Sequence, residues 1–109
     1  MNELVTLIAA RALIATPEAW IQGRFAQDAN GVPVGPFDEW ACKFCTVGAI
    51  TCASGEPLTE TRASILRAHL PKPFDNLVNF NDHPDTTHAD VLALFDRAIA
   101  SEEAKHERT

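Results

Sequence analysis

Hydrophobic positions recur at helical spacing near both ends of the chain. Residues 3–15 are apolar on almost every side and contain four alanines, which predicts a well-buried helix that ends before Pro17. Near the other end, Thr87 and Asp90 have the spacing of a capping box, and the apolar residues that follow repeat at i, i+3, i+4 and i+7. This pattern predicts a final helix that ends near Ala100.

Two more helices are expected in the middle of the chain. Asp38 can cap a helix over 39–54, which Gly55 and a nearby proline would end. Another helix is predicted over about 58–70, before two further prolines. Residues 74–80 are expected to form a short extended or irregular segment.

The segment between the first two helices has the pattern of a β-hairpin. Residues 20–27 alternate partly, and Asn30-Gly31 precedes a second short extended segment. Pro33 lacks a backbone donor, so that strand should lie at an edge. The expected fold is mainly α, a compact bundle of about four helices with a β-hairpin or ordered loop between the first two. We expect a single helical domain over 1–100 and a frayed polar tail over 101–109.

Composition fits a small soluble domain. The chain has 109 residues, 46% of them hydrophobic, which is enough for one core without disulfides. Three cysteines, the absence of a signal-peptide pattern and the absence of an apolar run of about 18 residues favour a cytoplasmic protein with reduced thiols. We expect no cofactor and no membrane contact, and the oligomeric state stays open, a homo-oligomer included.

The net charge of the chain indicates which class of partner it could bind. Nine basic and fifteen acidic residues give a formal net charge of −6. This charge argues against direct nucleic-acid binding, because a phosphate backbone would be repelled. It favours a protein partner with a basic surface, although a solvated acidic face is the simplest explanation of scattered acidic residues.

The cysteines offer several interpretations. If Cys42, Cys45 and Cys52 share one face of the predicted second helix, their simplest role is a close helix contact. The sharper alternatives are a zinc site formed by Cys42, Cys45, His83 and His88, and a redox C-x-x-C motif. Cys45 could also act as a nucleophile with one of these histidines as base, oriented by Asn81 or Asp82.

Two further groups could form a site or serve the fold. The polar segment 81–87 is rich in acceptors, and Asn, Asp and Thr there can satisfy turn and helix-cap hydrogen bonds. Aromatic residues flank the hairpin, and they either pin it to the helices or form an exposed binding surface. These aromatic residues are Trp20, Phe25, Phe37 and Trp40.

Three short motifs stand out in the sequence: Trp20-Ile21-Gln22-Gly23, Cys45-x-x-Gly48-Ala49 and Asn81-Asp82. Together they resemble a family of small uncharacterised proteins of bacteria and their phages, a domain of unknown function. The resemblance covers most of the chain and implies no activity. It does not include Cys42, His83 or His88 as fixed positions. It therefore implies that Trp20, Cys45, Asn81 and Asp82 form a shared site or a shared structural anchor.

Two functional hypotheses follow. The first is an acidic, non-enzymatic protein-binding module of phage type that inhibits a host protein or defence system, as an anti-CRISPR does. Its binding residues would be Trp20, Arg24, Phe25, Asn81, Asp82 and Asp85. The second is a thiol-dependent enzyme or ligand-binding domain that uses Cys45 with Asn81 and Asp82.

Overall fold

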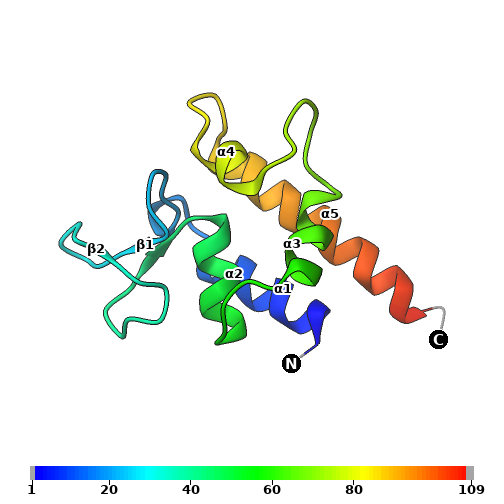
Figure 1. Ribbon diagram of the computed structural model, residues 1–109, viewed down its shortest axis with the longest axis horizontal. Helices are drawn as coiled ribbons and strands as arrows, with labels where there is room; N and C mark the ends of the chain where they lie inside the picture. The colour runs from blue at the N-terminus through cyan, green and yellow to red at the C-terminus, as the bar shows by residue number, and fades with distance from the viewer. Residues whose placement is uncertain (1, 108–109) are drawn as a thin grey trace.

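The computed structural model describes residues 2–107, which form a mainly helical fold (Figure 1). The elements, in chain order, are α1 (Glu3–Leu13), the 3₁₀ turn η1 (Pro17–Ala19), β1 (Ala26–Gln27), β2 (Pro33–Val34), β3 (Lys43–Phe44), α2 (Thr46–Ser54), α3 (Glu60–Arg67), α4 (Leu77–Asp82) and α5 (His88–Glu107). The predicted fold class is confirmed: the fold is a compact helical body with a small sheet between the first two helices.

The helical body is built around α1, which packs against both α2 and α5. The core residues come from all five helices and from the sheet: Leu7, Ala10, Ile14, Ala26, Phe44, Ala49, Ile50, Ala63, Leu66, Leu77, Phe80, Val91, Leu94, Phe95 and Ala98. Residues from all five helices and from strands β1 and β3 therefore meet in one hydrophobic core, as expected for one domain of this size.

The final helix begins as predicted and ends later. The backbone N–H of Thr87 donates to Asp90 at 2.9 Å and that of Asp90 to the Thr87 hydroxyl at 3.2 Å, which confirms the capping box. The prediction of a frayed tail is wrong as far as Glu107, because α5 continues to that residue. Within this part of the helix, the buried Glu102 side chain forms a 2.7 Å ion pair with Lys105. The last two residues of that predicted tail lie outside the described residues.

The predicted hairpin is confirmed and gains a third strand. β1 pairs antiparallel with β2 and with β3, in the order β2-β1-β3. Gly31 in the connecting turn has a φ of 82°, a conformation that favours glycine, and Pro33 lies on the edge strand as expected. Figure 1 shows the sheet at one side of the helical body, away from the C-terminal half of α5.

The prediction of a helix over 39–54 is wrong in its first part. Residues 43 and 44 form β3, since the backbone N–H groups of Cys42 and Cys45 donate to carbonyl groups of the β1 segment at 3.0 and 3.1 Å. Asp38 accepts from the N–H of Trp40 at 2.8 Å and caps a turn instead of a helix. The three cysteines therefore do not share a helix face, because Cys42 and Cys45 precede α2.

The prediction of an extended or irregular segment over 74–80 is wrong in its second half, where α4 (Leu77–Asp82) begins. Asn76 caps this helix by accepting from the N–H of Asn79 at 3.0 Å, and Leu77 and Phe80 are buried against the core. The helix predicted over 58–70 is confirmed with shorter bounds as α3.

Candidate functional site

Asn81, at the end of α4, is the centre of a buried hydrogen-bond network. Its side-chain oxygen accepts from the indole N–H of Trp20 at 2.8 Å, and from the backbone N–H and hydroxyl of Thr46 at 2.9 and 2.8 Å. Its amide nitrogen donates to the carbonyl of Ile21 at 3.1 Å and to Asp82 at 2.9 Å. Asn81 is 1% exposed, and its side-chain amide uses these hydrogen bonds to join α4 to α2 and to residues 20–21, which lead into the sheet.

The next two residues of the W-I-Q-G motif bind the same end of α4. The Gln22 amide donates to the carbonyl groups of Asn81 and His83, both at 3.0 Å. The N–H of Gly23, whose φ is 84°, donates to Asp82 at 2.9 Å. Carbonyl groups near the end of a helix lack intrahelical partners, so Gln22 supplies part of the C-terminal cap of α4. Sequence reasoning did not single out Gln22, although it belongs to the motif.

Gly48 explains the C-x-x-G-A motif through a close backbone approach. A Cβ atom at this position would lie 1.9 Å from the carbonyl oxygen of Phe25. The same oxygen accepts from the N–H of Cys45 at 3.1 Å, and the Cys45 sulfur accepts from the N–H of Gly48 at 3.2 Å. Cys45 is therefore the N-cap of α2, and Gly48 allows that helix to lie against the sheet segment.

Cys45, Asn81 and Asp82 do come together, around a cavity of about 110 Å³ that Arg24 and Phe25 also line. Cys45 is only 5% exposed, and this burial raises the pKa of its thiol above the ordinary value of 9.0. The hydrogen bond from Gly48 opposes that effect, whereas the negative charge of Asp82 adds to it. Cys45 is thus a protonated thiol at neutral pH, which is a poor nucleophile.

The histidines of the alternative sites are engaged elsewhere. His83 accepts from the N–H of Asp85 at 3.1 Å and packs edge-on against Phe74, and His88 bonds to the carbonyl of Ile14 at 2.6 Å. All three cysteines are free thiols, and Cys42 is exposed. In the described part of the chain, no three His, Cys, Asp or Glu side chains are grouped to hold a metal ion. The four residues of the predicted zinc site, Cys42, Cys45, His83 and His88, are not assembled.

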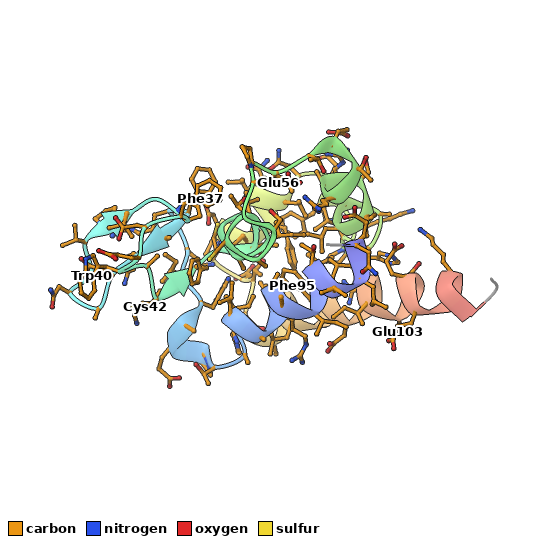
Figure 2. All side chains as sticks on the ribbon, turned by 90° about the horizontal axis from the view of Figure 1, so that it is seen from below. Phe37, Trp40, Cys42, Glu56, Phe95 and Glu103 are labelled. Atoms are coloured by element: carbon orange, nitrogen blue, oxygen red, sulfur yellow. The ribbon has the colours of Figure 1, made fainter. Side chains whose placement is uncertain are left out.

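Four large apolar side chains of the sheet segment are exposed. They are Phe25, Val32, Phe37 and Trp40, and we call them the aromatic lobe. Trp40 is 71% exposed and Phe37 is 58% exposed. Figure 2 places Trp40 at the end of the molecule opposite Glu103. Of the predicted aromatic group, only Trp20 pins the segment to the helices.

Four of the six residues predicted for binding, Arg24, Phe25, Asn81 and Asp82, line the cavity of about 110 Å³ together, whereas Trp20 and Asp85 do not line it. Arg24 and Phe25 lie at the lobe, where Arg24 donates to Gln27 and to the carbonyl of Gly31 at 3.3 and 3.1 Å. The group formed by Trp20, Asn81 and Asp82 is the structural network described above.

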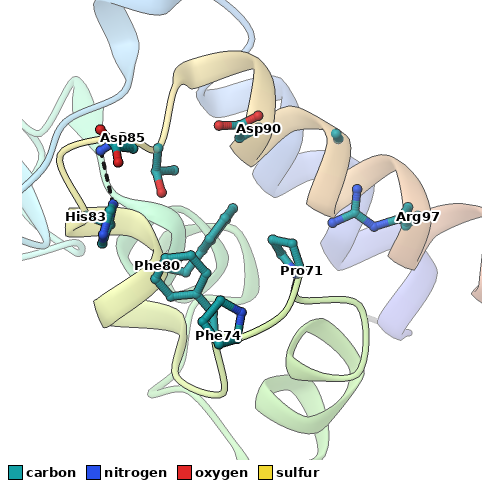
Figure 3. Close-up of a pocket in the computed structure, with 10 residues that line it drawn as sticks. Pro71, Phe74, Phe80, His83, Asp85, Asp90 and Arg97 are labelled. Atoms are coloured by element: carbon teal, nitrogen blue, oxygen red, sulfur yellow. Dashed lines mark hydrogen bonds between the residues drawn. The ribbon is translucent and has the colours of Figure 1, made fainter.

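Asp85 lies apart from both groups and lines a larger cavity of about 600 Å³ between α4, α5 and the loop before α4 (Figure 3). We call it the α4–α5 cavity. Its lining consists of Pro71, Pro73, Phe74, Phe80, His83, Asp85, Thr86, Asp90, Ala93 and Arg97. Of the candidate site residues named from the sequence, His83 and Asp85 line this cavity, and the cavity itself was not predicted because its lining comes from three separate segments.

These features define a small, mainly helical protein in which the motif residues hold a sheet against the helices. Residues 3–101 match a family of unknown function (DUF6197), and the chain belongs to that family. No curated protein and no solved structure matches the chain. The resemblance inferred from the motifs is confirmed, and no activity comes with it. Over the described residues, no helix is both long enough and apolar enough to span a membrane.

Proposed function

We propose that the protein is a non-enzymatic binding module that docks on a protein partner through the aromatic lobe. The observation that carries the proposal is the concentration of exposed Phe25, Val32, Phe37 and Trp40 on one short segment. Several exposed large apolar side chains on one segment are typical of interaction sites, and tryptophan is enriched among residues that dominate binding energy.

The anchoring of the lobe supports this role. Behind it, Asn81 bonds to Trp20 and Thr46, and the Phe25 carbonyl lies against Gly48. A surface held in one conformation loses little entropy when a partner binds. The lobe is therefore suited to recognise a partner without first having to fold.

The charge of the chain suggests the chemistry of the partner. The exposed side chains of Asp38 and Glu39 adjoin Trp40 in sequence, and the whole chain carries a net charge of −6. A partner with a basic surface around an apolar recess would complement this combination. In its finer form, the proposal is a phage-type inhibitor that occupies the basic surface of a host protein or defence system, as an anti-CRISPR does.

The thiol-dependent alternative has less support. Cys45 is buried and protonated, and its neighbouring polar groups are committed to structural hydrogen bonds. The adjoining cavity of about 110 Å³ is smaller than ordinary ligand pockets, which measure roughly 300–1,000 Å³.

Affinity capture from a lysate of the native host tests the proposal. A variant with Phe37→Ala and Trp40→Ala alters the lobe, and a matched control with Val5→Ala and Ile8→Ala removes two exposed apolar side chains from α1. We expect a stoichiometric partner with the wild type and the control, and its loss with the lobe variant. Retention by the lobe variant, or no stoichiometric partner at all, would contradict the proposal.

A further inference from the structure

The α4–α5 cavity has the dimensions and lining of a small-molecule site. Its volume of about 600 Å³ falls within the range of roughly 300–1,000 Å³ that ligand pockets occupy. In Figure 3, Phe74, Phe80 and Pro71 form an apolar wall, while Asp85, Asp90 and Arg97 lie along the opposite side. An apolar wall facing a few polar groups is the usual arrangement that binds and orients a ligand.

Thr86 offers a further hydrogen-bonding group to a ligand in the cavity. Its side chain lines the cavity and is only 8% exposed, yet its hydroxyl makes no hydrogen bond with any described residue. This hydroxyl oxygen is not sealed from solvent, because no fully buried side-chain oxygen or nitrogen of the described residues lacks a hydrogen-bond partner, so it is open to the cavity. A ligand that supplies a hydrogen-bonding group here would satisfy it.

The acidic end of the cavity is suited to an amine. Within the described residues, the exposed Asp85 carboxylate has no hydrogen-bond or ion-pair partner. One oxygen of Asp90 caps α5 by accepting from the N–H of Thr87 at 2.9 Å, which leaves its other oxygen available. Two carboxylates and a hydroxyl together offer the acceptors that an ammonium group requires.

The other end of the cavity is suited to an anion. Arg97 donates from Nε and Nη2 to the carbonyl of His69 at 3.1 and 2.8 Å, which fixes its guanidinium and leaves Nη1 available. Asp90 and Arg97 are two turns apart on α5, about 10 Å along the axis at 1.5 Å per residue. A ligand that reaches both side chains must extend along this part of α5.

We propose that the α4–α5 cavity binds a short peptide with free termini, about three residues long and apolar in its middle. Three extended residues span about 10 Å, which is comparable with the axial separation of Asp90 and Arg97 along α5. The ammonium group would lie at Asp85, Thr86 and Asp90, and the carboxylate at Arg97. The central side chain would pack on Phe74 and Phe80. This site is independent of the aromatic lobe.

Titration with the tripeptide Ala-Phe-Ala tests the proposal. Nuclear magnetic resonance of the labelled protein should show saturable shifts at Phe80, Thr86 and Ala93, and calorimetry should give the dissociation constant. N-acetylation or C-amidation of the peptide should each weaken binding about tenfold, since each removes one charge-assisted contact at a partly exposed site.

Variants locate the two termini. Asp85→Asn should weaken binding of the free tripeptide about tenfold and leave binding of the N-acetylated peptide unchanged. Arg97→Gln should weaken binding of the free tripeptide about tenfold and leave binding of the amidated peptide unchanged. Asp75→Asn, which alters an exposed aspartate outside the cavity lining, is the matched control and should have no effect. Absence of saturable binding to the folded wild type would overturn the proposal. Equal binding of the free and N-acetylated peptides would also overturn it.

Discussion

The indole N–H of Trp20 donates a 2.8 Å hydrogen bond to the side-chain oxygen of Asn81, across 61 positions of the chain. This bond joins the segment that leads into the sheet to the end of α4 (Figure 1). Asn81 also fixes the first residue of α2 through Thr46. Trp20 and Asn81 therefore hold the segment that carries the aromatic lobe on the helical body.

Asn81→Ala should be strongly destabilising. The substitution leaves the buried N–H groups of Trp20 and Thr46 and the carbonyl of Ile21 without their partner, so we expect a loss of about 3–5 kcal/mol in the free energy of unfolding. Urea denaturation measures it. The matched control is Asn79→Ala on the exposed side of the same helix, which should change stability by less than about 1 kcal/mol.

Trp20→Phe should have a smaller effect. It removes one hydrogen bond and part of a half-buried ring, which predicts a loss of about 1–2 kcal/mol. Trp40→Phe, at an exposed position, should stay within about 0.5 kcal/mol of the wild type. Combining Trp20→Phe with Asn81→Ala should cost less than the sum of the single effects, because both act on one network. Strict additivity would show that the bond contributes nothing.

Gly48→Ala should prevent normal packing of α2 on the sheet segment. The added Cβ would lie 1.9 Å from the carbonyl oxygen of Phe25, so the backbone must move, at a cost of about 3 kcal/mol or more. Gly35→Ala is the control, because its Cβ would meet no atom within 4 Å. Thermal and urea unfolding of both variants check this prediction, and equal stability of the two would contradict the close approach.

The thiols should differ in reactivity with Ellman's reagent at neutral pH. Cys42 is exposed and should react first, while Cys52 is half-buried and should react more slowly. Burial raises the pKa of the Cys45 thiol, so this residue should react only when the protein unfolds. Stopped-flow measurement of Cys42→Ser and Cys45→Ser assigns the phases. Fast reaction of Cys45 in the folded protein would revive the thiol-dependent alternative.

The raised pKa of Cys45 also predicts a pH dependence. In the unfolded chain the thiol ionises near its ordinary value of 9.0, whereas the folded protein holds the proton to higher pH. Above about pH 9 the folded state therefore binds more protons than the unfolded state. The contribution of Cys45 to the free energy of unfolding is fully present below about pH 9 and is lost as the pH rises through the pKa of the thiol in the folded protein. Urea titrations between pH 7 and roughly pH 10 should show a shallower decline for Cys45→Ala than for the wild type.

The sequence was informative wherever local chemistry determines structure. Thr87 and Asp90 predicted the start of α5, and Asn30-Gly31 and Pro33 predicted the hairpin and its edge strand. The start of α2 could not be predicted in this way. Residues 43 and 44 pair with β1, and this long-range backbone pairing overrides the apparent helical pattern around Asp38.

The candidate sites, like the fold, could be predicted from the sequence only in part. The resemblance implied that Trp20, Cys45, Asn81 and Asp82 form a shared site or a shared structural anchor. In the structure, hydrogen bonds link Trp20, Asn81 and Asp82, and Cys45 lines a cavity with Asn81 and Asp82, which spacing alone could not show. The α4–α5 cavity depends on how two helices and a loop pack, so no local pattern marks it. The exposure of Trp40 could not be predicted either, because Trp40 lies in a turn before β3 and not in the predicted helix.

The most direct test of the proposed function is the dissociation constant of the purified partner for Trp40→Ala, with the free energy of unfolding measured on the same sample. We predict an increase of about 30-fold or more in the dissociation constant, as for a binding hot spot of about 2 kcal/mol, and a change in stability below about 0.5 kcal/mol. An unchanged dissociation constant in a stably folded variant would contradict the claim that the aromatic lobe is the docking surface.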